Sequence, residues 1–119
     1  DQLAALTTKP LAITETGYPA QSFQVSVGAD LQFDSDQQKQ AEYIQLLLEE
    51  AATYDFRFVV NFVLRDYDDL WQAIGGQEDL TIVWRDTGLY SEDGTERESL
   101  GIWREWLARD VKQSGVFGG

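Results

Sequence analysis

The clearest regular pattern of apolar and polar positions lies in residues 36–53. Apolar side chains recur there at helical spacing, at Ala41, Ile44, Leu47, Leu48 and Ala51. Just before this stretch, Ser35-x-x-Gln38 fits a capping box, and Asp36 suits the positive end of a helix dipole. We therefore expect a helix over residues 36–53.

Two shorter apolar segments have the composition of strands. Residues 9–15 (KPLAITE) have an apolar centre, with Pro10 near the first position, where its missing N–H is tolerated. Residues 56–64 (FRFVVNFVL) are almost continuously apolar and rich in β-branched and aromatic side chains. Such continuity is typical of a strand buried on both faces, as in a parallel sheet.

A second helix is predicted over residues 98–112. Thr95-x-x-Glu98 is another capping box, and the inner face of this helix would be lined by Leu100, Trp103, Trp106, Leu107 and Val111. Residues 16–34 and 65–96 read as long loops, the second interrupted by a short extended piece at 80–84. The chain is thus expected to be one domain over residues 1–119.

The order of elements, strand–helix–strand–helix, predicts an α/β fold of two consecutive parallel β/α units with right-handed crossovers. The link from helix to strand is about two residues, whereas both loops after the strands are long, which marks that end as the functional one. Two parallel strands leave both sheet edges open. We therefore expect completion by other copies of the chain or by a missing remainder.

Charge and composition narrow the classes of function. The net charge of −12, from 21 acidic and 9 basic residues, argues against nucleic acid and anionic membranes as partners. It is compatible with a neutral glycan, although the acidic residues could serve solubility alone. Without Cys or His, disulfides and thiolate chemistry are excluded, and catalysis would have to use Asp, Glu, Tyr, Ser or Lys.

Targeting and membrane signals are also lacking in the sequence. The apolar runs are much shorter than a membrane span, and no basic-then-apolar signal peptide opens the chain. Because Met is absent even at position 1, we expect the chain to have been processed or excised from something longer.

The segment Ile13-Thr14-Glu15-Thr16-Gly17-Tyr18-Pro19 is the strongest candidate for chemistry. It places the Glu15 carboxylate where a buried strand runs into a long loop, with Gly17 allowing a sharp turn. Glycoside hydrolysis requires two carboxyl groups that flank the scissile bond. The alternative for Glu15 is structural: it could cap the loop or pair with an arginine.

The same segment, extended to Lys9–Pro19, resembles the seventh-strand region of the clan A retaining glycoside hydrolases. Residues 58–64 with Arg65-Asp66-Tyr67 resemble the eighth strand, and Trp84-Arg85-Asp86-Thr87-Gly88-Leu89-Tyr90, Asp93-Gly94 and the Trp103/Trp106 helix resemble the common ending. The resemblance implies that the chain is a quarter of a TIM (β/α)₈ barrel and that Glu15 is the nucleophile. It favours a secreted or extracytoplasmic location, which the residues themselves leave undetermined.

Departures from that family pattern are equally informative. The acid/base of the clan is a Glu, usually in an Asn-Glu pair at the end of strand four. No Asn-Glu occurs here, because Asn61 is the sole Asn. Strands one to six have no counterpart. The resemblance therefore implies that the acid/base lies outside this chain.

Further residues could contact a sugar. Asp66 and Tyr67 could bond its hydroxyl groups, Arg65 could orient a carboxylate, and Tyr18 and Trp71 could stack on its C–H faces. The alternative is a salt-bridged loop in which an Asp caps a short helix at Asp68–Ala73. Because Asp66-x-Asp68-Asp69 lacks the Gly and the distal Glu of an EF-hand, we expect no metal site.

These observations favour a C-terminal fragment of a retaining O-glycosyl hydrolase that acts on a polysaccharide or oligosaccharide. By resemblance, Glu15 would be its nucleophile, and we expect that no cofactor is required and that the isolated chain is inactive. Two alternatives remain open: a non-catalytic acidic β/α module that self-assembles, and a glycan-binding module that uses the loop aromatics.

Overall fold

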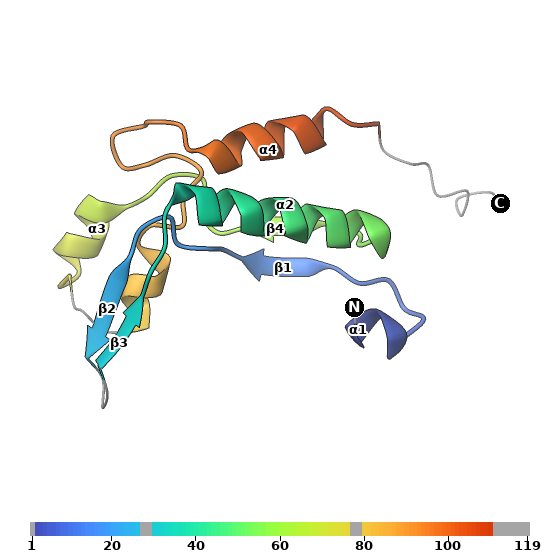
Figure 1. Ribbon diagram of the computed structural model, residues 1–119, viewed down its shortest axis with the longest axis horizontal. Coiled ribbons are helices and arrows are strands. Elements are labelled where there is room, and N and C mark those ends of the chain that lie inside the picture. The colour runs from blue at the N-terminus through green and yellow to red at the C-terminus, as the bar shows by residue number, and fades with distance from the viewer. Residues whose placement is uncertain (1, 27–29, 77–79, 111–119) are drawn as a thin grey trace.

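The computed structural model describes residues 2–26, 30–76 and 80–110 (Figure 1). Along the chain the elements are α1 (Gln2–Ala5), β1 (Ile13–Thr16), β2 (Phe23–Ser26), β3 (Asp30–Phe33), α2 (Gln37–Thr53), β4 (Val59–Asn61), α3 (Asp68–Ala73), the 3₁₀-helix η1 (Leu80–Trp84) and α4 (Glu98–Leu107). None of the helices in these ranges is long and apolar enough to cross a membrane.

One parallel β–α–β unit forms the body of the molecule. Strands β1 and β4 pair in parallel with Ile13 opposite Val59 and Thr16 opposite Asn61, and an irregularity lies between the two pairs. Helix α2 connects them, and α4 packs alongside α2 (Figure 1). The α2–α4 packing buries Ala41, Ile44, Leu48 and Leu100.

Strands β2 and β3 form an antiparallel hairpin that projects from this body (Figure 1). Along β2, buried Phe23 and Val25 alternate with exposed Gln24 and Ser26, as in a strand with one covered face. The covered face packs on η1 and α3 in a second small core made of Phe23, Val25, Trp71 and Ile82.

The predicted fold class, two consecutive β/α units forming a quarter of a TIM barrel, is wrong. The segment expected to be a loop after the first strand contains a hairpin with its own sheet, so the molecule has a two-stranded parallel sheet and a separate two-stranded antiparallel sheet. The expected extended piece at 80–84 is a 3₁₀-helix. The overlooked signal was the alternation in 23–26 (FQVS), which buries two side chains against η1.

Helix α2 begins one residue later than its capping motif suggested. The N-cap is Asp36, whose carboxylate accepts a hydrogen bond from the Lys39 amide at 2.9 Å. Within α2, Gln40 is only 1% exposed, and its side-chain amide forms hydrogen bonds to three other segments. It donates to the carbonyls of Tyr18 and Gly88, both at 3.1 Å, and accepts from the Ser99 hydroxyl at 2.7 Å. The body is therefore held by a buried amide as well as by apolar packing.

The strand β4 and its flanks remain largely uncovered. Phe58, Val60 and Leu64 are 52%, 46% and 64% exposed, although residues 56–64 have the composition of a strand buried on both faces. On α4, Leu100 is buried and the two tryptophans are half-buried, whereas Leu107 is 77% exposed; Val111 lies outside the described residues. Exposed apolar side chains thus include three in and beside β4, although others lie on the helices and on β3.

Candidate functional site

Glu15 lies on β1, next to its last residue, with an exposed side chain. Within the described part of the chain, its carboxylate makes no hydrogen bond or ion pair. Arg65, one of the arginines with which Glu15 could have paired, instead donates from Nε to the Glu92 carbonyl at 2.9 Å. Strand β1 therefore holds the backbone of Glu15, while its carboxylate bonds to no side chain of the described residues.

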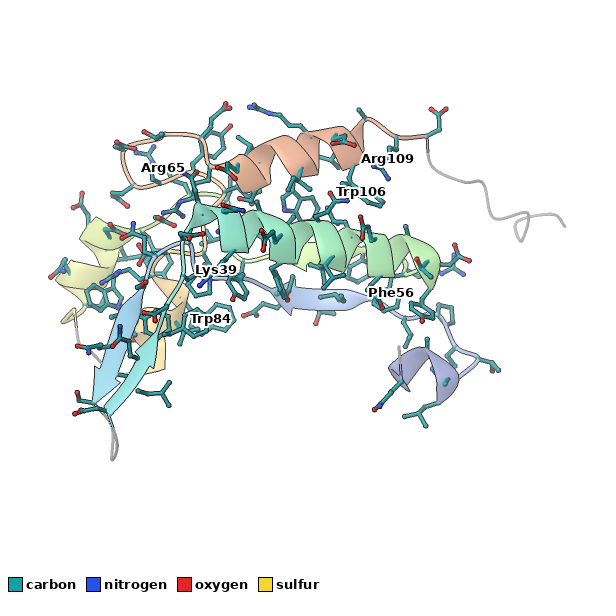
Figure 2. All side chains as sticks on the ribbon, viewed as in Figure 1. Lys39, Phe56, Arg65, Trp84, Trp106 and Arg109 are labelled. Carbon is teal, nitrogen blue, oxygen red and sulfur yellow. The ribbon has the colours of Figure 1, made fainter. Side chains whose placement is uncertain are left out.

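Aromatic rings gather around the backbone that follows Glu15. A Cβ atom at Gly17 would lie 2.5 Å from the Phe62 carbonyl and 3.3 Å from the ring of Trp84, so only glycine fits there. Glycine is needed at position 17 because the Phe62 carbonyl lies so close to it, and not for the sharp turn expected from the sequence. The rings of Phe62 and Trp84 meet edge to face, with centroids 5.4 Å apart. In Figure 2, Trp84 lies in the corner between β1 and the projecting hairpin.

The end of β1 is anchored to α2 through aromatic side chains. The Thr16 hydroxyl and the Tyr43 hydroxyl are 2.5 Å apart, so one donates a hydrogen bond to the other. Tyr18, two residues beyond, stacks on Tyr43 with ring centroids 4.9 Å apart. These contacts join residues distant in the sequence, and sequence reasoning missed Tyr43 because no local pattern marks it.

Asp66 belongs to a buried ion pair. Its carboxylate accepts hydrogen bonds from both terminal nitrogens of Arg97, at 2.6 and 3.1 Å, and from the Gly88 amide at 2.8 Å. Arg97 also donates to the carbonyls of Gly88 and Asp86, at 2.9 and 3.3 Å. This network ties together the chain after β4, the segment after η1 and the start of α4. Both carboxylate oxygens of Asp66 thus already accept hydrogen bonds within the protein, which favours the salt-bridged alternative for this loop.

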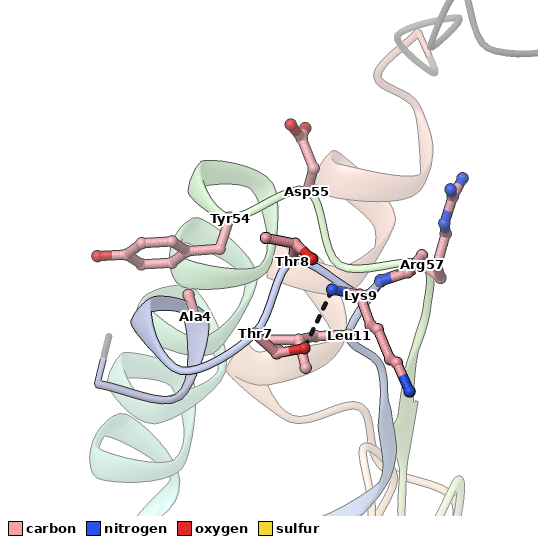
Figure 3. Close-up of a pocket in the computed structure, with 9 residues that line it drawn as sticks. Ala4, Thr7, Thr8, Lys9, Leu11, Tyr54, Asp55 and Arg57 are labelled. Atoms are coloured by element: carbon pink, nitrogen blue, oxygen red, sulfur yellow. Dashed lines mark hydrogen bonds between the residues drawn. The ribbon is translucent and has the colours of Figure 1, made fainter.

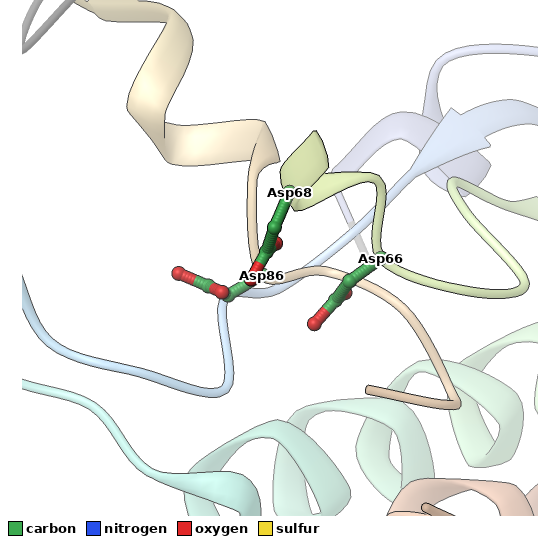
Figure 4. A group of neighbouring side chains, drawn as sticks. All are labelled: Asp66, Asp68 and Asp86. Carbon is green, nitrogen blue, oxygen red and sulfur yellow. The ribbon is translucent and has the colours of Figure 1, made fainter. Parts of the chain in front are cut away.

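Three carboxylates, Asp66, Asp68 and Asp86, lie close together (Figure 4). One ligand oxygen from each falls within 4.8 Å of the others. Asp66 is paired with Arg97, however, and Asp86 with Arg85 at 2.7 Å. Burial and the neighbouring carboxylates raise the pKa of Asp68, whose buried Oδ1 accepts no hydrogen bond from the described residues. Two of the three charges are thus already balanced by arginines.

The remaining sequence candidates are mostly packed. Tyr67 precedes α3, is half-buried and contacts the Phe62 ring edge to face at 6.2 Å. Trp71 is 5% exposed in the hairpin core, with the Arg85 guanidinium 5.4 Å from its ring centroid. Its faces are therefore covered. The helix Asp68–Ala73 forms, but its N-cap is Tyr67, which makes no side-chain cap.

A hollow of about 290 Å³ lies at the other end of β1, lined in part by Lys9, Tyr54, Asp55 and Arg57 (Figure 3). The Lys9 amide hydrogen bonds to the Thr7 hydroxyl at 3.0 Å. In Figure 3 the charged ends of Lys9 and Arg57 point in different directions. The two cations therefore do not converge on one anion position.

Comparison of the chain with protein-family models, with curated proteins and with solved structures finds no match.

Proposed function

We propose that the chain carries the nucleophile of a retaining O-glycosyl hydrolase, that Glu15 is this nucleophile, and that the acid/base carboxyl group lies outside the chain. The observation that carries the proposal is the state of Glu15. Its carboxylate is exposed and unpaired within the described residues, on a strand whose end is locked by neighbouring contacts. The sequence resemblance of Lys9–Pro19 points to the same residue.

The surroundings of Glu15 suit a sugar. Trp84 is partly exposed and lies against Gly17, two residues after Glu15. Aromatic faces pack on the C–H faces of pyranose rings, and the ring of Trp84 meets that of Phe62 edge to face. A carboxylate without a hydrogen-bond partner among the described residues (Glu15) and a packed aromatic ring (Trp84) together support a carbohydrate as the substrate.

The chemistry follows the retaining mechanism. A Glu15 carboxylate oxygen attacks the anomeric carbon, the bond to the leaving oxygen breaks, and an acid from outside the chain protonates that oxygen. Water then hydrolyses the glycosyl ester, with the same outside residue acting as base. Retention requires the two carboxyl groups about 5–5.5 Å apart. Because general acid catalysis contributes about 10²–10⁴ in rate, the isolated chain should not turn over ordinary glycosides.

A second candidate rests on a different observation, the exposed apolar strand. Phe58, Val60 and Leu64 favour a self-assembling module in which these side chains are covered by other copies and Glu15 has no chemical role. A glycan-binding module without hydrolysis is the third possibility, and labelling of Glu15 separates both from the nucleophile proposal.

The test uses activated substrates whose leaving group needs no acid. Dinitrophenyl 2-deoxy-2-fluoroglycosides of glucose, galactose and xylose are incubated with the chain, and the peptides are analysed by mass spectrometry. We expect one glycosyl ester, on Glu15, that is lost in Glu15→Gln. Glu49→Gln, which removes an exposed carboxylate of α2, should leave labelling unchanged. No adduct, or adducts on other carboxylates, would refute the proposal.

A further inference from the structure

A hollow of about 290 Å³ opens between the hairpin and η1. It is lined by Ser22, Phe23, Gln24, Gln32, Ile82 and Arg85. Gln24 and Gln32 are direct cross-strand partners in the hairpin register, so their exposed amides lie side by side. Two neighbouring amides, each with a donor and an acceptor group, form one wall of the hollow.

Several polar groups of this hollow, Gln32 among them, are held in place before any ligand binds. Arg85 pairs with Asp86 at 2.7 Å and lies over the ring of Trp71. The Gln32 amide donates to Asp34 at 2.9 Å, and the Ser22 hydroxyl donates to the Ser35 carbonyl at 3.1 Å. Polar groups fixed in this way lose little conformational freedom when a ligand binds.

The chemistry of the lining selects a class of ligand. Amides that both donate and accept match hydroxyl groups, which also do both. The charge of Arg85 is already balanced by Asp86, and the lining contains no other cation, so an anionic ligand gains no extra attraction. Phe23 and Ile82 add a small apolar surface. These features together fit a neutral polyhydroxylated ring.

The hollow and the surroundings of Gly17 involve consecutive residues of one segment. Arg85 lines the hollow, and the preceding residue, Trp84, touches Gly17 near the end of β1. The backbone also joins the two places, because the Ala20 amide donates to the Asp86 carbonyl at 2.8 Å. The hollow and Gly17 thus share the segment 84–86, and the inference takes a ligand of several sugar units to contact both places.

From this arrangement we infer that the hairpin hollow is an accessory sugar subsite, and that the substrate is a neutral oligosaccharide or polysaccharide chain. The inference deepens the proposed function and rests on it for the direction of the glycan past Glu15. Binding of a sugar in the hollow requires no chemistry at Glu15. An experiment can therefore refute the subsite without refuting the nucleophile, and the reverse.

Isothermal titration with cellohexaose, β-1,4-galactohexaose, xylohexaose and hexagalacturonate tests the subsite. We expect at least one neutral hexasaccharide to bind, and to bind at least tenfold more tightly than its monosaccharide. Gln24→Ala/Gln32→Ala should weaken it about fivefold to a hundredfold, the loss expected for two neutral hydrogen bonds. Gln2→Ala/Gln38→Ala, which removes two exposed amides outside the hollow, should change affinity less than twofold.

The single variant Gln24→Ala controls for loss of folding in the double variant. The Gln24 side chain is exposed and makes no hydrogen bond to the described residues, so its removal should leave the fold intact. It should weaken binding about threefold or more. The inference is overturned if no neutral hexasaccharide binds, if hexagalacturonate binds as tightly, or if the hairpin glutamines do not matter. Glu15→Gln should bind normally; hexasaccharide binding without labelling of Glu15 would refute the proposed nucleophile alone.

Discussion

Replacing Asp66 with Asn tests whether the buried ion pair holds the second half of the chain together. Asp66 and Arg97 are 5% and 8% exposed, and Oδ1 of Asp66 accepts from both Arg97 and the Gly88 amide. In the variant, the Asn oxygen must take this doubly bonded position. Its NH₂ group then replaces Oδ2 and faces Nη2 of Arg97 at the 2.6 Å contact, donor against donor.

The expected cost follows from what remains buried. Arg97 keeps its bonds to two carbonyls but loses its counter-charge, and breaking one partner of a buried pair costs about 3–5 kcal/mol. The pKa of Asp66 is raised because burial outweighs the lowering by Arg97 and the Gly88 amide, so the cost of burying this carboxylate offsets much of the pair's benefit before the substitution. We therefore expect a loss near the lower end, about 3 kcal/mol.

Urea unfolding followed by circular dichroism measures this loss. With a slope of about 1–3 kcal/mol per molar urea, 3 kcal/mol lowers the midpoint by about 1–3 M, or unfolds the variant if total stability is small. Asp69→Asn, an exposed neighbour, should change stability by less than about 0.5 kcal/mol. A loss below about 1 kcal/mol in Asp66→Asn would show that the network does not hold these segments together.

Three further outcomes are expected. The pKa of Asp68 is raised in the folded protein, so the folded state is most stable, as far as this group is concerned, below the unfolded pKa of about 3.9. That stability is lost as pH rises through the folded pKa and the carboxyl group ionises. Asp68→Asn should therefore raise the melting temperature at pH 7 and change it little at pH 4. Glu15→Gln should alter the free energy of unfolding by less than about 0.5 kcal/mol, and a loss of about 1–3 kcal/mol would instead reveal a structural partner. Sedimentation at micromolar concentration should show self-association that Val60→Lys reduces, whereas a compact cooperative monomer would contradict it.

Local patterns predicted the two long helices of this fold. The apolar spacing in 36–53 corresponds to α2 at Gln37–Thr53, and the helix predicted from residue 98 begins at Glu98. The capping box predicted at Thr95 is wrong, because the N-cap of α4 is Arg97, which makes no side-chain cap. Helical periodicity and caps act within a few residues, so they can be read from one sequence. The hairpin was missed because Gly and polar residues around 23–33 hid an alternation only four residues long.

The surroundings of the candidate site depend on contacts that no local pattern encodes. The Thr16–Tyr43 bond and the Asp66–Arg97 pair join residues 27 and 31 positions apart. Sequence reasoning singled out Asp66 for its polarity and its place after a strand, and both features fit a ligand contact and a buried ion pair equally well. Only the position of Arg97 distinguishes the two, and that position follows from the packing of the whole second half.

The position of Glu15 links the proposed chemistry to the uncovered strand. Catalytic groups must be held within about 0.5 Å of their productive geometry, which favours rigid elements. Strand β1 is joined to a single neighbour, and isolated two-stranded sheets are marginal in water. Under the proposed function, the protein that supplies the acid/base must also lie close to Glu15. If that protein covers Val60 and adds strands to the open sheet, one association both stabilises β1 and completes the pair of carboxyl groups. Val60→Lys would then reduce glycoside turnover in the assembled enzyme even though it leaves every proposed catalytic group in place.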